Sequence, residues 1–163
     1  MHSTLALKLR KQATETGDTK MSVEVVAYNS SIEGNVKVAN NFAVKEFKSS
    51  DSKIVFIHKL LPQGLQKIRD KVGKAVKLTN AYRTDSHNKR VGGASNSYHL
   101  FGMAADIYVE GMAPLQLAKI VDGLFPDKYC VIAYPKKGIV HFDVRTKKYR
   151  AINDGKEKAV TSF

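Results

Sequence analysis

The chain has 163 residues, of which 43% are hydrophobic, and 27 Lys and Arg against 15 Asp and Glu give a net charge of +12. This length suits one domain with a core of its own, and the apolar runs are far shorter than the roughly 20 residues of a membrane-spanning helix. The single cysteine, Cys130, excludes an internal disulfide and a cysteine-based zinc finger. The positive charge favours polyanionic partners, which are nucleic acid, acidic membrane surfaces or anionic cell-wall polymers. We expect no nucleic-acid partner, because the basic residues form no continuous arm and do not alternate with aromatic residues.

The two ends of the chain differ in character from its middle. Residues 1–20 are polar, and we expect a poorly ordered lead-in there. Residues 21–150 are expected to form the domain, and residues 151–163 a polar tail. The apolar run at residues 5–7 is too short for a signal peptide.

In the first half of the chain, short strands alternate with one clear helix. β-branched residues predict strands over residues 21–28 and 54–57, and another around Val76 and Leu78. A helical turn is predicted over residues 41–47. An amphipathic helix that stops at Gly73 is predicted by apolar residues at helical spacing, namely Leu61, Leu65, Ile68 and Val72.

The second half begins with a long polar loop over residues 80–99, and a loop of that length usually carries function. A strand is predicted over residues 104–109, and a helix begins at Pro114. Two further strands, over residues 129–134 and 139–145, are separated by a short turn and predict a hairpin. The chain is therefore expected to be a single α+β domain with a mainly antiparallel sheet and helices packed on it.

Two histidines stand next to acidic residues in this second half. His99 precedes Asp106 by seven residues, and the small Gly102 between them lets the chain turn back closely. His141 and Asp143 are two apart, so their side chains point to the same face of a strand. A catalytic zinc ion needs three nitrogen or oxygen ligands and one open position, and His99, Asp106 and His141 can supply them.

The motifs that contain these residues resemble those of a known family. They are Asn-Ala-Tyr-Arg at residues 80–83, Ser-Tyr-His-Leu-Phe-Gly-Met-Ala-Ala-Asp at residues 97–106 and Val-His-Phe-Asp-Val-Arg at residues 140–145. In this order they resemble the zinc D-alanyl-D-alanine carboxypeptidase family of metallopeptidases, from about residue 42 to residue 145. Phage endolysin catalytic domains belong to it, and the hedgehog signalling domain shares its fold group.

The resemblance implies a zinc site on the sheet with one Zn²⁺ per chain. Its ligands would be His99, Asp106 and His141. Arg83 would bind the carboxylate of the substrate, a task that suits a planar guanidinium, and Ser97 would support the metal loop or contact substrate. The activity implied is zinc-dependent hydrolysis of peptide bonds in bacterial peptidoglycan, by a carboxypeptidase or an endopeptidase of endolysin type.

One departure from the family pattern leaves the roles of two residues open. Many members place an acidic base three residues before the third ligand, where this chain has Gly138 or, if Asp143 is the ligand, Val140. Neither can take a proton, so Asp143 is the candidate catalytic base. One alternative is that Asp143 orients a metal ligand without binding the metal itself. The other is that Asp143 is the third ligand and His141 the base. A non-catalytic zinc-binding module of the same fold, which binds cell wall or a partner, is the alternative function.

The resemblance also implies where the protein acts. We expect a monomer that works at the cell wall, outside the cell or in the periplasm, either in a bacterium or as a phage lysis or virion protein.

Overall fold

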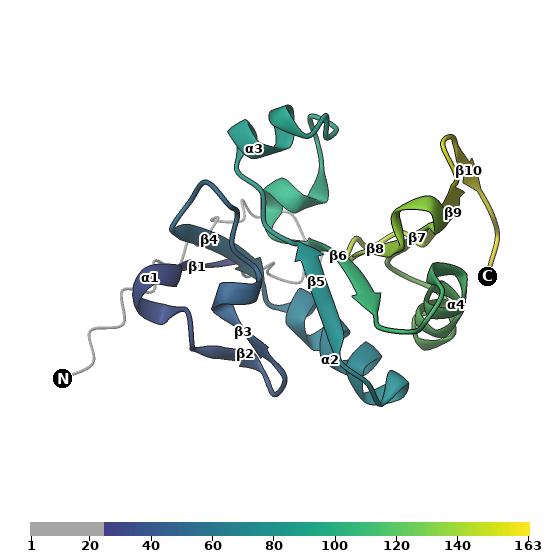
Figure 1. Cartoon of the computed structure of the whole chain (residues 1–163), viewed down its shortest axis with the longest axis horizontal. Coiled ribbons are helices and arrows are strands. Elements are labelled where there is room, and N and C mark those ends of the chain that lie inside the picture. The colour runs from purple at the N-terminus through teal and green to yellow at the C-terminus, as the bar shows by residue number, and fades with distance from the viewer. Residues whose placement is uncertain (1–24) are drawn as a thin grey trace, which may run out of the picture.

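A computed structural model of the chain describes residues 25–163 (Figure 1). The expected lead-in over residues 1–20 and the start of the strand predicted over residues 21–28 lie outside the described residues. The strands described are β1 (Val25–Asn29), β2 (Lys37–Ala39), β3 (Phe42–Ala43), β4 (Ile54–His58), β5 (Val76–Asn80), β6 (Ala104–Val109), β7 (Cys130–Tyr134), β8 (Ile139–Asp143), β9 (Tyr149–Asn153) and β10 (Glu157–Ala159). The helices are α1 (Ser30–Glu33), α2 (Leu60–Val72), α3 (Asp85–Arg90) and α4 (Pro114–Leu124), with 3-10 helices η1 (Val44–Glu46), η2 (Tyr98–Phe101) and η3 (Pro135–Lys137).

The main sheet has six strands in the order β10-β9-β7-β8-β6-β5. All neighbouring strands are antiparallel except β7 and β9, which run parallel. Two small sheets, β1-β4 and β2-β3, lie beside it (Figure 1). This architecture confirms the expected α+β domain with a mainly antiparallel sheet.

Helices α2 and α4 cover one face of the main sheet. The predicted apolar face of α2 is buried at Leu61, Leu65 and Ile68, and the helix ends at Gly73, whose φ of 68° is the left-handed cap that glycine favours. Helix α4 packs on β6, β7 and β8 and also contacts α2. Each fully buried aliphatic side chain contributes about 1.5–3 kcal/mol, so this layer holds the sheet in place.

On the other face of the sheet, β6 and β8 carry polar residues. In β6 and β8 the alternation of side chains sends Ile107 and Phe142 to the helices, where both are buried in the core. Asp106 and His141, which occupy the intervening positions, point to the opposite face. Because the helices cover only one face, the strands can present charged groups there without disturbing the core.

The loop that enters β6 is fixed by Gly102. Its φ is 64°, its N–H bonds the carbonyl of His99, and its carbonyl accepts from the N–H of His58 in β4. A Cβ at this position would overlap the carbonyl oxygen of Phe56. Only glycine allows the chain to turn here while it touches β4.

Two predicted segments differ from what is observed. The loop over residues 80–99 contains α3, a six-residue helix that begins where the Thr84 side chain accepts from the N–H of His87. Residues 41–47 form the short strand β3 followed by η1 rather than one helical turn. The conformation of the first segment depends on the Thr84 cap, and that of the second on the pairing of β3 with β2. A single cap or a single pairing leaves no periodic pattern in the sequence.

Residues 151–163, where a polar tail is predicted, contain the last residues of β9 and the strand β10. Strand β9 ends at Asn153 and pairs with β7, and β10 adds the edge of the sheet. The Arg150 side chain is fully buried, donates to Asp122 at 2.6 Å and bonds the carbonyls of Phe125 and Tyr129. These contacts tie the start of β9 to α4.

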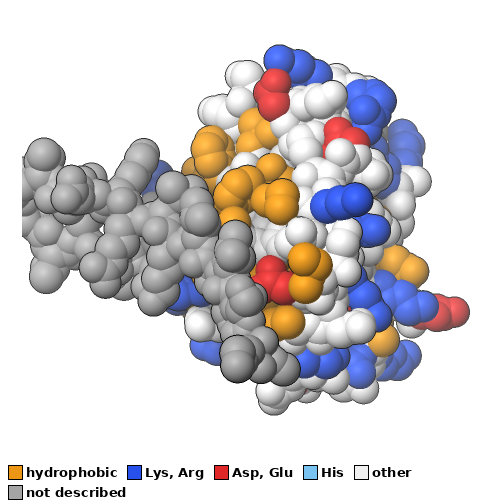
Figure 2. Space-filling view, turned by 90° about the vertical axis from the view of Figure 1, so that its left-hand side faces the viewer, with side chains coloured by type: hydrophobic (Ala, Val, Ile, Leu, Met, Phe, Trp, Pro, Cys, Tyr) orange, Lys and Arg blue, Asp and Glu red, His pale blue; other side chains and the backbone are white. Residues whose placement is uncertain are grey.

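Lys and Arg side chains lie at the top, right and bottom of the face shown in Figure 2, and several hydrophobic side chains lie left of its centre. Among residues 25–163, no helix is both long and apolar enough to cross a membrane.

We predict that Gly102→Ala destabilises the protein by about 2–4 kcal/mol, because left-handed strain of about 1–2 kcal/mol adds to the overlap with β4. Gly111→Ala is the matched control, since Gly111 has a φ of 75° and no atom within 4 Å of an added Cβ. Its cost should be about 1 kcal/mol. Denaturant unfolding measures both variants, and equal losses would show that the contact with β4 is not what requires glycine.

Candidate functional site

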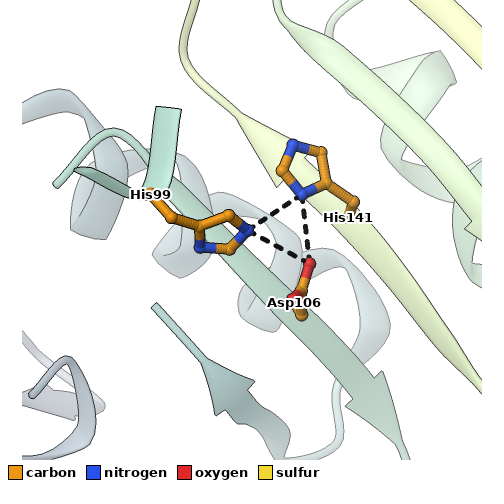
Figure 3. Close-up of side chains that lie close together, drawn as sticks. All are labelled: His99, Asp106 and His141. Atoms are coloured by element: carbon orange, nitrogen blue, oxygen red, sulfur yellow. Dashed lines mark hydrogen bonds and ion pairs between the residues drawn. The ribbon is translucent and has the colours of Figure 1, made fainter. Parts of the chain in front are cut away.

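Three elements bring His99, Asp106 and His141 together (Figure 3). His99 lies in η2, where the Ser97 side chain caps the turn by accepting from the N–H of His99 at 3.4 Å. Asp106 lies in β6 and His141 in β8, and the two are direct partners in the antiparallel register. The sheet therefore sets the position of two of these residues, and the loop that ends at Gly102 adds the third.

One atom of each residue points toward the other two (Figure 3). The Nε2 of His99 lies 3.2 Å from the Nδ1 of His141 and 3.4 Å from the Oδ1 of Asp106. The Nδ1 of His141 lies 3.0 Å from the same Oδ1. Ligand atoms at 2.0–2.2 Å from a tetrahedral ion lie about 3.3–3.6 Å apart. The three inward atoms are thus spaced nearly as the ligands of one small cation would be.

The remaining polar atom of each side chain has an outer partner. The Nδ1–H of His99 donates to the carbonyl of Ala81 at 2.6 Å, because a carbonyl can only accept. Arg83 donates to the Oδ2 of Asp106 at 2.9 Å, and the Nε2–H of His141 donates to Asp143 at 3.0 Å. Such partners orient metal-binding side chains and fix the tautomer of the histidines.

Asp143 is itself held by Arg145. The guanidinium donates to both carboxylate oxygens, at 2.8 Å from Nε and 2.6 Å from Nη2, and the Arg145 backbone N–H adds a third bond. The Arg145 guanidinium carbon lies 4.4 Å from the ring centre of Tyr98 and 5.6 Å from that of Tyr149. The Asp143 side chain has 0% exposure. Its carboxylate is therefore shut off from solvent and committed to His141 and Arg145.

Sequence analysis did not single out Arg145 as a functional residue. His141, Asp143 and Arg145 are each two residues apart, and the residues between them, Phe142 and Val144, are apolar. The first two lie in β8 and Arg145 follows its end. That spacing is the signal that could have indicated a chain of contacts from His141 through Asp143 to Arg145.

The charges in this cluster support one another. Burial opposes the charged form of His141, but its hydrogen bonds to Asp106 and Asp143 outweigh burial and raise its pKa to about 9. Burial alone would raise the pKa of Asp143, yet hydrogen bonds from His141 and Arg145 lower it to about 2. Burial lowers the pKa of His99, which favours its neutral, lone-pair-bearing form.

A second group of potential ligands shares His141. It consists of Cys130, His141 and Asp143, whose ligand atoms also lie within 4.8 Å of one another. Burial raises the pKa of the Cys130 thiol, and Arg145 occupies both oxygens of Asp143. A metal ion needs a thiolate and a free carboxylate oxygen, so this group is the weaker candidate. Cys130 is fully buried in β7.

The other residues of the long loop serve its structure. Asn88 is buried, donates to the carbonyl of Ala94, and fills the space where Gly93 would carry a side chain. The Nδ1 of His87 lies 2.8 Å from the hydroxyl of Ser49. These contacts attach α3 to the segment before β4 and hold the loop that ends at His99.

Comparison with known proteins adds an independent finding. The family model described as Peptidase M15 matches residues 33–143, more than half of the chain, and the match includes His99, Asp106, His141 and Asp143. No curated protein matches the chain. By this match and by the resemblance of its motifs, the chain belongs to the Peptidase M15 family, the family of the zinc D-alanyl-D-alanine carboxypeptidases.

Proposed function

We propose that the protein is a zinc-dependent peptidase that hydrolyses peptide bonds in the stem peptides of bacterial peptidoglycan. The observation that carries this proposal is the convergence of three inward atoms, on His99, Asp106 and His141, each backed by an outer partner. Two imidazoles and one carboxylate are a donor set of the kind found in catalytic zinc sites. Membership in a peptidase family supports hydrolysis over a purely structural metal site.

The donor atoms fit a single zinc ion per chain. Bound there, the ion supplies Lewis-acid chemistry, because it polarises a scissile carbonyl and lowers the pKa of a water molecule toward about 7. The outer partners keep the lone pairs of His99 and His141 directed inward. His99, Asp106 and His141 would hold the ion and, as three protein ligands, would leave room beside it for water or a substrate oxygen.

The geometry favours an orienting role for Asp143 over the role of catalytic base proposed from the sequence. Its oxygens contact the Nε2 of His141, on the side of the ring opposite to the inward Nδ1, and they are enclosed by Arg145. A base must reach the proton that it removes, within about 3 Å or through one water. Asp143 instead holds the His141 ring and stabilises its charge.

Arg83 and Ser97 act next to the ligands. Arg83 is bonded to Asp106 and its side chain is 13% exposed, so its proposed contact with a substrate carboxylate would use the donors that Asp106 leaves free. Ser97 supports the loop of His99 through its cap. The proposed role of Arg83 would put substrate recognition beside Asp106.

The charge of the chain suits the proposed place of action. A net charge of +12 attracts the protein to anionic cell-wall polymers, which fits work at the wall, outside the cell or in the periplasm. The proposed enzyme acts as a monomer, as a carboxypeptidase or as an endopeptidase of endolysin type.

We predict that the purified protein binds about one zinc ion per chain and, when loaded, cleaves wall peptides that contain D-amino acids. Removal of any one ligand, in His99→Ala, Asp106→Ala or His141→Ala, should abolish both properties. Asp143→Asn should weaken zinc affinity or activity by about 10–100-fold, the usual effect of an outer partner. Elemental analysis and mass spectrometry of the products measure the two properties.

Asp70→Asn is the control, because Asp70 is an exposed acid on α2, away from the ligand face. Zinc binding without cleavage of any wall peptide would favour the non-catalytic module. Full zinc binding in His141→Ala, together with its loss in Asp143→Asn, would exchange the roles of these two residues. Retention in both variants would contradict the proposed site.

We also predict that zinc affinity rises with pH. The raised pKa of His141, about 9, means that its protonated form dominates below that pH, and binding at Nδ1 must release the proton. Apparent affinity should therefore fall about tenfold for each pH unit below 9, or about 100-fold from pH 8 to pH 6. Competition with a chromophoric chelator measures it, and equal affinities at these two pH values would show that His141 is not a ligand.

A further inference from the structure

The ligand face of the sheet extends well beyond the three candidate ligands. Asp106 is paired with His141, His141 with Ile132, Ile132 with Ala151, and Ala151 with Ala159. Directly paired residues point to the same face of a sheet. One continuous surface therefore runs from the ligands in β6 and β8 across β7 and β9 to β10.

Glu157 stands at the far end of this surface. It lies two positions before Ala159 in β10 and therefore points to the same face. Between Glu157 and the ligands, the floor consists of Cys130, Ile132 and Ala151, which are buried and on which Tyr134 and Tyr149 pack. The result is a small apolar floor with tyrosines on it, bordered by metal ligands at one end and a carboxylate at the other.

The Glu157 carboxylate is oriented but not neutralised. Its Oε1 accepts from the hydroxyl of Tyr149 at 2.7 Å, and within residues 25–163 it forms no ion pair with a Lys or Arg side chain. Its neighbours Lys156 and Lys158 line a hollow with Ile152, on the other face of the hairpin. Among the described residues the Glu157 carboxylate thus has no ion-pair partner, which leaves it able to pair with a cationic group of a bound molecule.

Two tyrosines connect Glu157 with the ligand cluster. The Tyr149 ring lies beside Arg145, which holds Asp143, while its hydroxyl holds Glu157. Burial raises the pKa of Tyr134 to about 12, and the negative charges of Glu157 and Asp106 add to the shift. The Tyr134 phenol therefore interacts electrostatically with Glu157 at one end of the surface and with Asp106 at the other.

The distance from the candidate metal ligands to the Glu157 carboxylate is similar to the length of a short extended peptide. Three steps between strands of about 4.8 Å each separate β8 from β10, so Glu157 lies on the order of 15 Å from His141. Extended peptide covers about 3.3–3.6 Å per residue. A substrate with its scissile bond at the ligands would reach Glu157 after about four residues, or sooner through a long side chain.

We propose that Glu157, oriented by Tyr149, binds a primary ammonium group of the peptide substrate and so selects peptides that carry one. The proposal rests on the proposed peptidase function and deepens it, because it assigns a charge preference to the substrate. Glu157 lies outside residues 33–143, the part matched by the family model, so this preference belongs to the C-terminal hairpin of this chain. The ammonium can come from a diamino side chain or from a free N-terminus.

The test compares three otherwise identical D-amino-acid-containing peptides with the zinc-loaded enzyme. One carries a lysine with a blocked N-terminus, the second carries Nε-acetyl-lysine with a blocked N-terminus, and the third carries Nε-acetyl-lysine with a free N-terminus. The enzyme should prefer the first or the third over the second by about fivefold in kcat/KM, the upper range for an exposed ion pair. Which of the two is preferred identifies the source of the ammonium.

Variants then assign the preference to Glu157. Glu157→Gln should remove it, and Glu157→Lys should reverse it. Tyr149→Phe, which keeps the ring beside Arg145 but removes the hydroxyl, should reduce it about twofold. Glu110→Gln is the matched control, because Glu110 is an exposed acid paired with Lys77 and lies four strands away across the sheet; it should leave the preference unchanged.

The outcomes separate this proposal from the proposed function. If no peptide is cleaved by the wild type, the peptidase proposal fails, and calorimetric dissociation constants for the same peptides still test the subsite. Equal kcat/KM and equal dissociation constants for the three peptides would overturn the ammonium subsite. A preference that survives in Glu157→Gln would overturn the assignment to Glu157.

Discussion

The pairing of Asp106 with His141 across β6 and β8 is the constraint on which the rest of the site depends. Side chains alternate along a strand, so a slip of one residue would turn His141 into the core and Phe142 toward the ligands. The apolar residues between them, packed beneath α2 and α4, hold the register. Burial on one face of the sheet thus fixes the chemistry on the other, and His99 reaches the pair only because Gly102 lets the loop turn against β4.

His141, Asp143 and Arg145 are connected in series by hydrogen bonds that lead away from the ligand atoms. Buried charges are costly unless they are paired, and here His141 is bonded to Asp143, which in turn is bonded to Arg145 between Tyr98 and Tyr149. This arrangement gives the inward nitrogen of His141 a fixed direction before any ligand binds. Tyr149 contacts Arg145 with its ring and orients Glu157 with its hydroxyl. The support of the ligands and the proposed substrate preference therefore depend on one shared residue.

Sequence reasoning succeeded where the pattern is local and periodic. Strand β6 and the β7–β8 hairpin follow from short apolar runs separated by turn residues, and the order of the motifs made Asp106 and His141 candidate ligands before their register was known. It failed where partners are distant or polar. Helix α3 depends on the cap at Thr84, and β9 depends on the buried pair between Arg150 and Asp122, 28 residues apart. Neither contact has a repeating signature in the sequence, so neither α3 nor β9 was predicted.

X-ray absorption at the zinc edge tests the central claim most directly, because it identifies the atoms around the bound ion. We predict a shell of nitrogen and oxygen at about 2.0–2.2 Å that contains two imidazoles and no sulfur. That shell corresponds to His99, Asp106 and His141. A sulfur neighbour at about 2.3 Å would place the ion on Cys130 and Asp143 instead, and would contradict the account of how this face of the sheet works.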